Sequence, residues 1–113
     1  MLVAKMNYLE FPVTDFAVAK SFYGQAFGWT FTDYGDSYVE FSDGDNTGGF
    51  NLADSVDPGD TYIILLHQDL EGMQAQVQAA GGTLTRETFS FPGGERFEFK
   101  DPFGRQFAIW RPV

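Results

Sequence analysis

The chain has 113 residues, a length typical of one compact domain, and 43% of them are hydrophobic. Its 16 acidic residues outnumber its 7 basic residues, and the net charge of −9 argues against nucleic acid or an anionic membrane surface as a partner, because both attract basic proteins. The chain contains no cysteine, which excludes disulfides, thiolate nucleophiles and thiolate metal ligands.

The first half of the chain predicts a strand, a helix and three further strands. Residues 8–15 end in Asp15, and aspartate favours the start of a helix because its carboxylate accepts the free amides of the first turn. Apolar residues then recur at helical spacing up to Gly28, where glycine suits the left-handed end of a helix. Strands are expected near residues 29–34, from residue 39, and at residues 47–53.

The second half repeats this order. Residues 62–69 parallel residues 8–15, each running from a tyrosine to an aspartate, and a helical pattern follows Asp69 up to Gly81. Residues 97–102 parallel residues 39–44, and strands are also expected near residues 83–88 and 105–111. We therefore predict an α+β fold in one domain over residues 1–113. It contains two βαβββ modules, at about residues 6–53 and 61–113, joined by the linker 54–60.

Strand periodicity divides each predicted sheet into a helix-covered face and an open face, because successive side chains point to opposite sides. On the first strand, Leu9, Phe11 and Val13 are expected beneath the helix. The same alternation places the following residues on the open face: Tyr8, Glu10, Tyr38, Glu40, Tyr62, Arg96, Glu98, Ala108 and Trp110. Aromatic rings with a few polar groups are typical of a ligand cleft. A half-exposed sheet face or a subunit interface is the alternative.

Two motifs point to a known family. The first helix runs from Asp15-Phe16 through Phe22-Tyr23 to Phe27-Gly28-Trp29, and residues 101–105 read Asp-Pro-Phe-Gly-Arg. Taken in order over nearly the whole chain, these motifs resemble the vicinal-oxygen-chelate superfamily of glyoxalases, bleomycin resistance proteins and extradiol dioxygenases. The resemblance implies a curved, partly open mixed β-barrel around a cleft. It also implies that two modules complete the cleft, within a chain or across a homodimer.

In metal-using members of that family, the first and last strands of each module supply four ligands, usually His, Glu or Gln. The resemblance places these positions at Tyr8, Phe50, Tyr62 and Ala108. Phenylalanine and alanine cannot bind a metal and tyrosine is an uncommon ligand, so we expect no metal and no cofactor. A different ligand set from His67, Glu10 and Glu40 is the alternative.

Glu10 is the candidate catalytic or ligand-anchoring residue, since a carboxylate beside aromatic rings can act as a general base or anchor a cationic ligand. Alternatively, it is a surface residue or pairs with Arg96 or Arg111. The predicted ligand-binding residues are Tyr8, Glu10, Tyr38, Glu40, Phe50, Tyr62, Glu98, Ala108 and Trp110.

Three functions are compatible with these features. The favoured hypothesis is metal-independent binding or sequestration of a small molecule, such as a cationic aromatic one, as in bleomycin-resistance-type proteins. The alternatives are a glyoxalase-like lyase, isomerase or dioxygenase-type enzyme, and an interaction module without a ligand. The N-terminal residues lack the apolar stretch of a secretory signal, and no apolar run is long enough to span a membrane, so a cytoplasmic location is expected.

Overall fold

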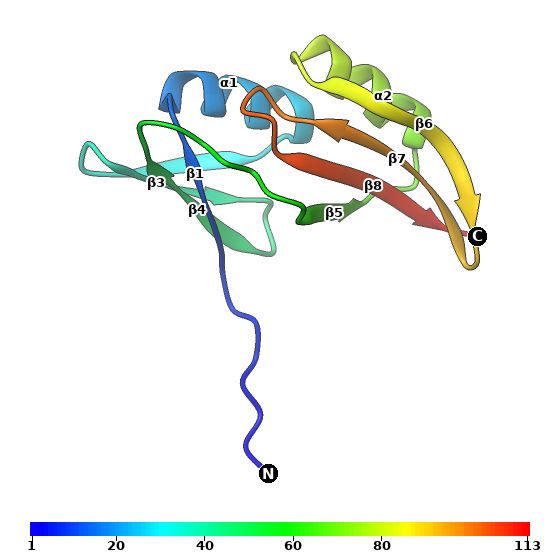
Figure 1. Ribbon diagram of the computed structural model, residues 1–113, viewed down its shortest axis with the longest axis horizontal. Helices are drawn as coiled ribbons and strands as arrows, with labels where there is room; N and C mark the ends of the chain where they lie inside the picture. Colours follow the sequence, from blue (N-terminus) through cyan, green and yellow to red (C-terminus); the bar gives the residue numbers. More distant parts are fainter.

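The computed structural model describes residues 1–113 and contains two four-stranded sheets, each carrying one helix (Figure 1). The first unit contains β1 (Leu9–Val13), α1 (Phe16–Phe27), β2 (Thr30–Tyr34), β3 (Tyr38–Ser42) and β4 (Thr47–Leu52). The second contains β5 (Tyr62–Leu66), α2 (Leu70–Ala79), β6 (Thr83–Phe91), β7 (Gly94–Lys100) and β8 (Gln106–Pro112). The predicted α+β fold with two βαβββ modules is confirmed.

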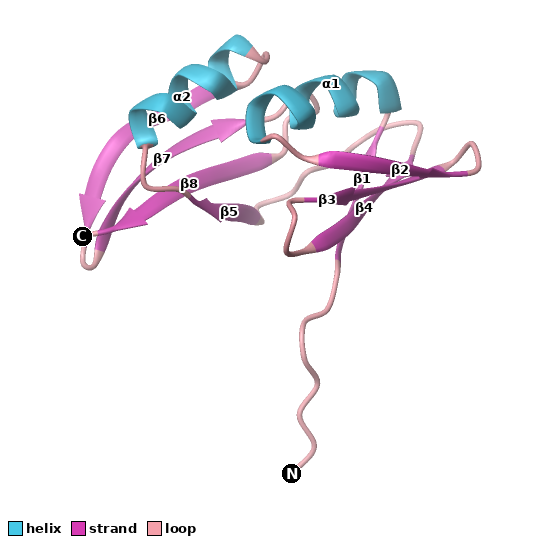
Figure 2. Ribbon diagram, turned by 180° about the vertical axis from the view of Figure 1, so that it is seen from behind, coloured by secondary structure: helices cyan, strands magenta, loops and turns pink.

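The two sheets have equivalent strand orders, β1-β4-β3-β2 and β5-β8-β7-β6. In each sheet the first strand runs parallel to the last, and the other pairs are antiparallel. Both helices lie on the same side of the molecule, which leaves the opposite faces of both sheets open (Figure 2). The sheets are not closed into a barrel, so the curvature expected from the resemblance is that of an open structure. Neither helix is long and apolar enough to cross a membrane.

The helices begin at the two predicted aspartates. The Asp15 carboxylate accepts the backbone N–H of Val18 at 3.0 Å, and the Asp69 carboxylate accepts that of Gly72 at 2.9 Å. Gly28 ends α1 with a φ of 73°, a left-handed conformation that glycine adopts without strain. The short loops that follow lead each helix directly into the next strand.

One aromatic core runs beneath both helices and joins the two sheets. Tyr23, on the buried face of α1, lies with its ring centroid 5.1 Å from that of Phe50 in the first sheet and 5.8 Å from that of Phe107 in the second. Aromatic pairs in this range add to the free energy gained from burial. Leu9, expected beneath α1, is instead exposed at the start of β1.

Tyr23 also makes the buried polar contact between the units. Its hydroxyl donates to Asp101 Oδ2 at 2.5 Å, and Asp101 Oδ1 accepts the backbone N–H groups of Phe103 and Arg105. Burial is the main cause that raises the pKa of both side chains above their ordinary values. The Arg105 guanidinium lies 4.9 Å from the ring centroid of Phe11. The turn before β8 is thereby held against α1 and β1 of the other unit.

Replacement of Tyr23 by phenylalanine tests this contact. Tyr23→Phe keeps the ring but removes a donor from a buried carboxylate, and we expect the free energy of unfolding to fall by about 1–3 kcal/mol in urea denaturation. The control is Tyr34→Phe, because Tyr34 is 57% exposed and its loss of a hydroxyl should change the free energy by less than about 0.5 kcal/mol. Equal stability of the two variants would show that the hydrogen bond does not hold the units together.

Candidate functional site

The open face of the first sheet carries tyrosines and glutamates around Gly49. In the strand register Gly49 lies between Glu10 on β1 and Glu40 on β3. Tyr38 reaches over the glycine, and its hydroxyl oxygen lies 2.9 Å from both Tyr8 Oη and Glu10 Oε1. Because a phenol has one proton, this geometry fits a chain in which Tyr8 donates to Tyr38 and Tyr38 donates to Glu10.

Gly49 makes room for this chain of hydrogen bonds. A Cβ atom at position 49 would overlap the Tyr38 hydroxyl and would lie 2.7 Å from that of Tyr8. Any other residue would therefore force the Tyr38 side chain away from Glu10. The absence of a side chain is what allows two phenols and a carboxylate to meet above the sheet.

The prediction that Phe50 lies on the open face is wrong. Phe50 pairs with Phe11 on β1 and Val39 on β3, and it is fully buried in the core beneath α1. Register places Gly49 between Glu10 and Glu40 just as Ala108 lies between Ile64 and Glu98 in the second sheet. The repeat partner of Ala108 is thus Gly49, and a shift of one residue moves a side chain to the other face of a sheet.

The open face of the second sheet has a cationic and aromatic character. Arg96 donates to Glu98 Oε2 from Nη2 at 2.6 Å and from Nε at 3.0 Å, so Glu98 is committed to this ion pair. The Arg96 guanidinium also lies 5.6 Å from the ring centroid of Tyr62 and 5.7 Å from that of Phe89. Arg86 stacks on Phe89 at 3.4 Å. This half of the face therefore presents guanidinium groups beside rings.

Trp110 lies on the same face and borders a shallow hollow of about 280 Å³ together with Ile64, Phe91 and Arg96. Ala108 is on this face by register but is fully buried. The sequence alternation missed Arg86, Phe89 and Phe91. Register shifts between Leu84 and Arg86 and between Arg86 and Phe89 interrupt the period of two, so simple counting along β6 fails there.

The alternative partners of Glu10 are occupied elsewhere. Arg96 pairs with Glu98, and Arg111 bonds to Glu95 and to the carbonyl of Gln68. Glu10 instead accepts a hydrogen bond from the Tyr38 hydroxyl, and only its Oε1 atom takes part in this bond. The Glu10 carboxylate is exposed and borders the open face, so it can accept a further donor from a ligand.

The donor groups of this face do not suit a metal ion. The four positions equivalent to family ligands are occupied by Tyr8, Gly49, Tyr62 and Ala108, of which two have no donor atom. No three His, Cys, Asp or Glu side chains are grouped to hold a metal. His67 follows β5, where its Nδ1 accepts the Asp69 amide, and is not brought into a ligand group with Glu10 and Glu40.

Tyr38 is kept protonated by its surroundings. Loss of solvent is the first cause that raises the pKa of its phenol well above the ordinary value. Hydrogen bonds to Tyr8 and Glu10 and the negative charge of the Glu10 carboxylate raise the pKa further. At neutral pH the phenol therefore keeps its single proton, which it donates to the adjacent Glu10 carboxylate.

Comparison with known proteins was consistent with this architecture. The family model described as Glyoxalase/Bleomycin resistance protein/Dioxygenase superfamily matches residues 5–109. No curated protein matches the chain.

Several solved structures share the fold at low sequence identity. A glyoxalase-related enzyme from Fulvimarina pelagi superposes with a TM-score of 0.81 at 20% identity, over 96% of this chain and 88% of that one. A glyoxalase/bleomycin resistance protein/dioxygenase family enzyme from Burkholderia phytofirmans PsJN superposes with a TM-score of 0.86 at 16% identity, over 97% of this chain and 100% of that one. The fosfomycin resistance protein FosX from Mesorhizobium loti superposes with a TM-score of 0.82 at 15% identity, over 99% of this chain and 95% of that one. These likenesses establish the fold alone.

The hydrogen-bonded chain can be tested by titration of Tyr38. Glu10→Gln removes a negative charge beside the phenol, and we expect the pKa of Tyr38 to fall toward its ordinary value, as followed by NMR of tyrosine labelled with ¹³C at Cζ. The matched control is Glu40→Gln, which leaves the Tyr38–Glu10 contact in place and should lower that pKa much less. An unchanged Tyr38 pKa in Glu10→Gln would contradict the hydrogen-bonded chain.

Proposed function

The chain belongs to the glyoxalase/bleomycin resistance protein/dioxygenase superfamily, and from this membership we propose that it binds a small molecule on its open face without a metal. The observation that carries the proposal is the Tyr38 hydroxyl above Gly49, held by Tyr8 and Glu10. Its phenol lies over the position where metal-using relatives would supply a ligand side chain. A ligand would meet phenol and carboxylate oxygens held in place as acceptors there instead of a metal ion.

A cationic group is the ligand chemistry best suited to the first sheet. Glu10 and Glu40 flank Gly49 on neighbouring strands, which places their backbones roughly 10 Å apart across the site. No lysine or arginine pairs with either carboxylate. A protonated amine between them would replace water with charge-assisted hydrogen bonds, and the ring of Tyr8 would cover an aromatic body.

We also propose that two copies complete the cleft as a homodimer. Apolar side chains are unusually exposed on the open face, with Ile64 at 50% and Leu66 at 62%. The first sheet presents Glu10 and Glu40, whereas Arg86, Arg96 and Lys100 lie in the register of the second sheet against one carboxylate, Glu98. If the first sheet of one copy faces the second sheet of its partner, the acidic side chains of one lie across the cleft from the basic side chains of the other. Two-fold symmetry produces this complementary contact twice in the dimer.

Ligand binding is tested by thermal-shift screening against cationic aromatic compounds, each paired with a neutral isostere. A ligand stabilises the folded state by mass action, so hits should raise the melting temperature of the wild-type chain. Glu10→Gln should weaken their binding by about tenfold or more, since a hydrogen bond to a charged group contributes about 1.5–3 kcal/mol. Glu71→Gln, on α2 away from the open face, is the isosteric control and should leave the affinity unchanged.

Two results would contradict this function. One is equal binding of the cationic hits by wild type and Glu10→Gln, which would remove Glu10 as the anchor. The other is a stoichiometric metal ion in the purified chain whose removal abolishes binding of the hits. Metal analysis before and after incubation with Zn²⁺, Ni²⁺ or Mn²⁺ distinguishes these cases.

The dimer is tested separately by sedimentation. Leu66→Asp places a charge on the open face, and we expect the dimer dissociation constant to rise by about tenfold or more in analytical ultracentrifugation. Val18→Asp, on the exposed side of α1, is the control and should sediment like the wild-type chain. A wild-type chain that remains monomeric at high concentration, or a Leu66→Asp variant that dimerises normally, would rule out this interface.

A further inference from the structure

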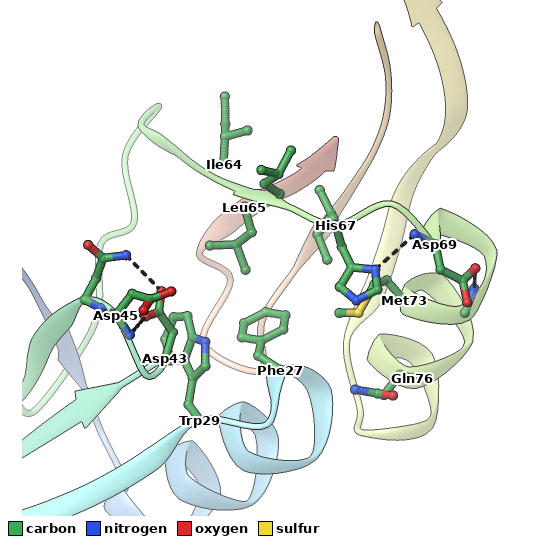
Figure 3. A pocket seen from close by; sticks show the side chains of 14 residues that line it. Phe27, Trp29, Asp43, Asp45, Ile64, Leu65, His67, Asp69, Met73 and Gln76 are labelled. Carbon is green, nitrogen blue, oxygen red and sulfur yellow. Dashed lines mark hydrogen bonds between the residues drawn. The ribbon is translucent and has the colours of Figure 1, made fainter. Parts of the chain in front are cut away.

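A hollow lies in a crevice between the two units (Figure 3). Its volume is about 700 Å³, within the range of small-molecule sites. The β3–β4 turn and the end of α1 form one side, and β5 and the start of α2 form the other. Apolar side chains in its lining include Phe27, Leu65, Met73 and Ile109. Neither the sequence pattern nor the proposed function accounts for this space.

Trp29 presents an unused hydrogen-bond donor to the crevice. The residue is only 9% exposed, and its ring stacks on Phe41 and Tyr23 at centroid distances of 4.6 Å and 5.3 Å. The edge that carries the indole nitrogen is turned toward the hollow, and no group of the chain accepts its proton (Figure 3). Because this N–H opens onto the hollow, it can donate either to water or to an acceptor oxygen of a ligand bound there.

The electrostatic character of the crevice favours a cation. Asp43 accepts the backbone N–H groups of Asp45 and Asn46, chiefly the latter, which lowers its pKa and keeps it ionised. Asp45 and Asp69 add two further carboxylates to the lining, which contains no lysine or arginine. A positive charge inside this crevice would therefore find carboxylates on both walls and no cationic side chain among the lining residues.

His67 supplies a second donor on the facing wall. Its Nδ1 accepts the backbone N–H of Asp69 at 3.0 Å, so the neutral imidazole carries its proton on Nε2. The crevice thus combines an apolar lining, two ring N–H donors and a carboxylate rim.

We propose that this crevice, whose lining includes Ile64 and Leu66 at the border of the open face, is a second binding site, distinct from the site around Tyr38, for a small aromatic amine that carries an oxygen acceptor. The ammonium group is attracted to the rim formed by Asp43 and Asp45. The aromatic body packs among Phe27, Leu65 and Met73. A hydroxyl or ether oxygen accepts the Trp29 N–H, which satisfies the donor that the chain itself leaves free.

The two tryptophans of the chain allow a direct test, because Trp29 lies in the crevice and Trp110 on the open face. The probe is tyramine, titrated to roughly 10 mM into ¹⁵N-labelled protein while both indole N–H signals are recorded, with Trp110→Phe used for assignment. We expect a saturable shift of the Trp29 signal. 4-Hydroxyphenylacetate, which has the same ring and hydroxyl but the opposite charge, should bind about tenfold more weakly or not at all.

A variant at the rim tests the role of charge. Asp45→Asn should raise the dissociation constant of tyramine by about fivefold, whereas Asp36→Asn, in the exposed β2–β3 turn outside the crevice, should not change it. A silent Trp29 signal, equal responses to tyramine and the carboxylate, or a response confined to Trp110 would each overturn the crevice site. The last result would leave the open-face proposal intact, and failure of the open-face screen would leave a Trp29 response standing.

Discussion

The hydrogen bond from Tyr23 to Asp101 connects two sheets that share no strand pairing. It links α1 of the first unit to the turn that begins β8 of the second, and the aromatic contacts of Tyr23 extend to both sheets. The open face and the crevice are both composed of elements from the two units. Their shapes therefore depend on this buried junction, because a rotation of one unit would separate residues that no backbone hydrogen bond holds together.

The absence of a side chain at Gly49 has a comparable effect within the first sheet. It allows Tyr38 to cross above the sheet and meet Tyr8 and Glu10. In a relative with a metal-binding side chain at this position, the same phenol would have to lie elsewhere. Gly49 thus leaves the space above the sheet to two phenols and a carboxylate, which meet there through hydrogen bonds.

The charges on the open face differ in sign between the two sheets. The chain is strongly acidic overall, yet Arg86 and Arg96 lie on the second sheet among aromatic rings. The net charge alone would predict a uniform acidic surface. The division into an acidic sheet and a cationic sheet is what supports a paired arrangement of two copies and a ligand held between unlike walls.

The two βαβββ units, their capping aspartates and most of the buried face could be predicted from the sequence, because each depends on local periodicity and on short-range hydrogen bonds. The Phe50 prediction was wrong for a physical reason: counting residues from a turn does not determine how two strands align, and a shift of one residue changes the face. For the same reason, the register shifts in β6 kept the strand periodicity from predicting Arg86 and Phe89 on the open face.

The sequence by itself determined the order of elements and the identity of Glu10, Tyr8 and Trp110 as open-face residues, since these depend on a period of two along single strands. The tertiary structure alone decided which side chain lies over Gly49, how Arg96 and Glu98 pair, and that Trp29 opens onto a crevice. Those features arise from contacts between segments distant in the chain. No local pattern encodes the geometry in which such segments meet.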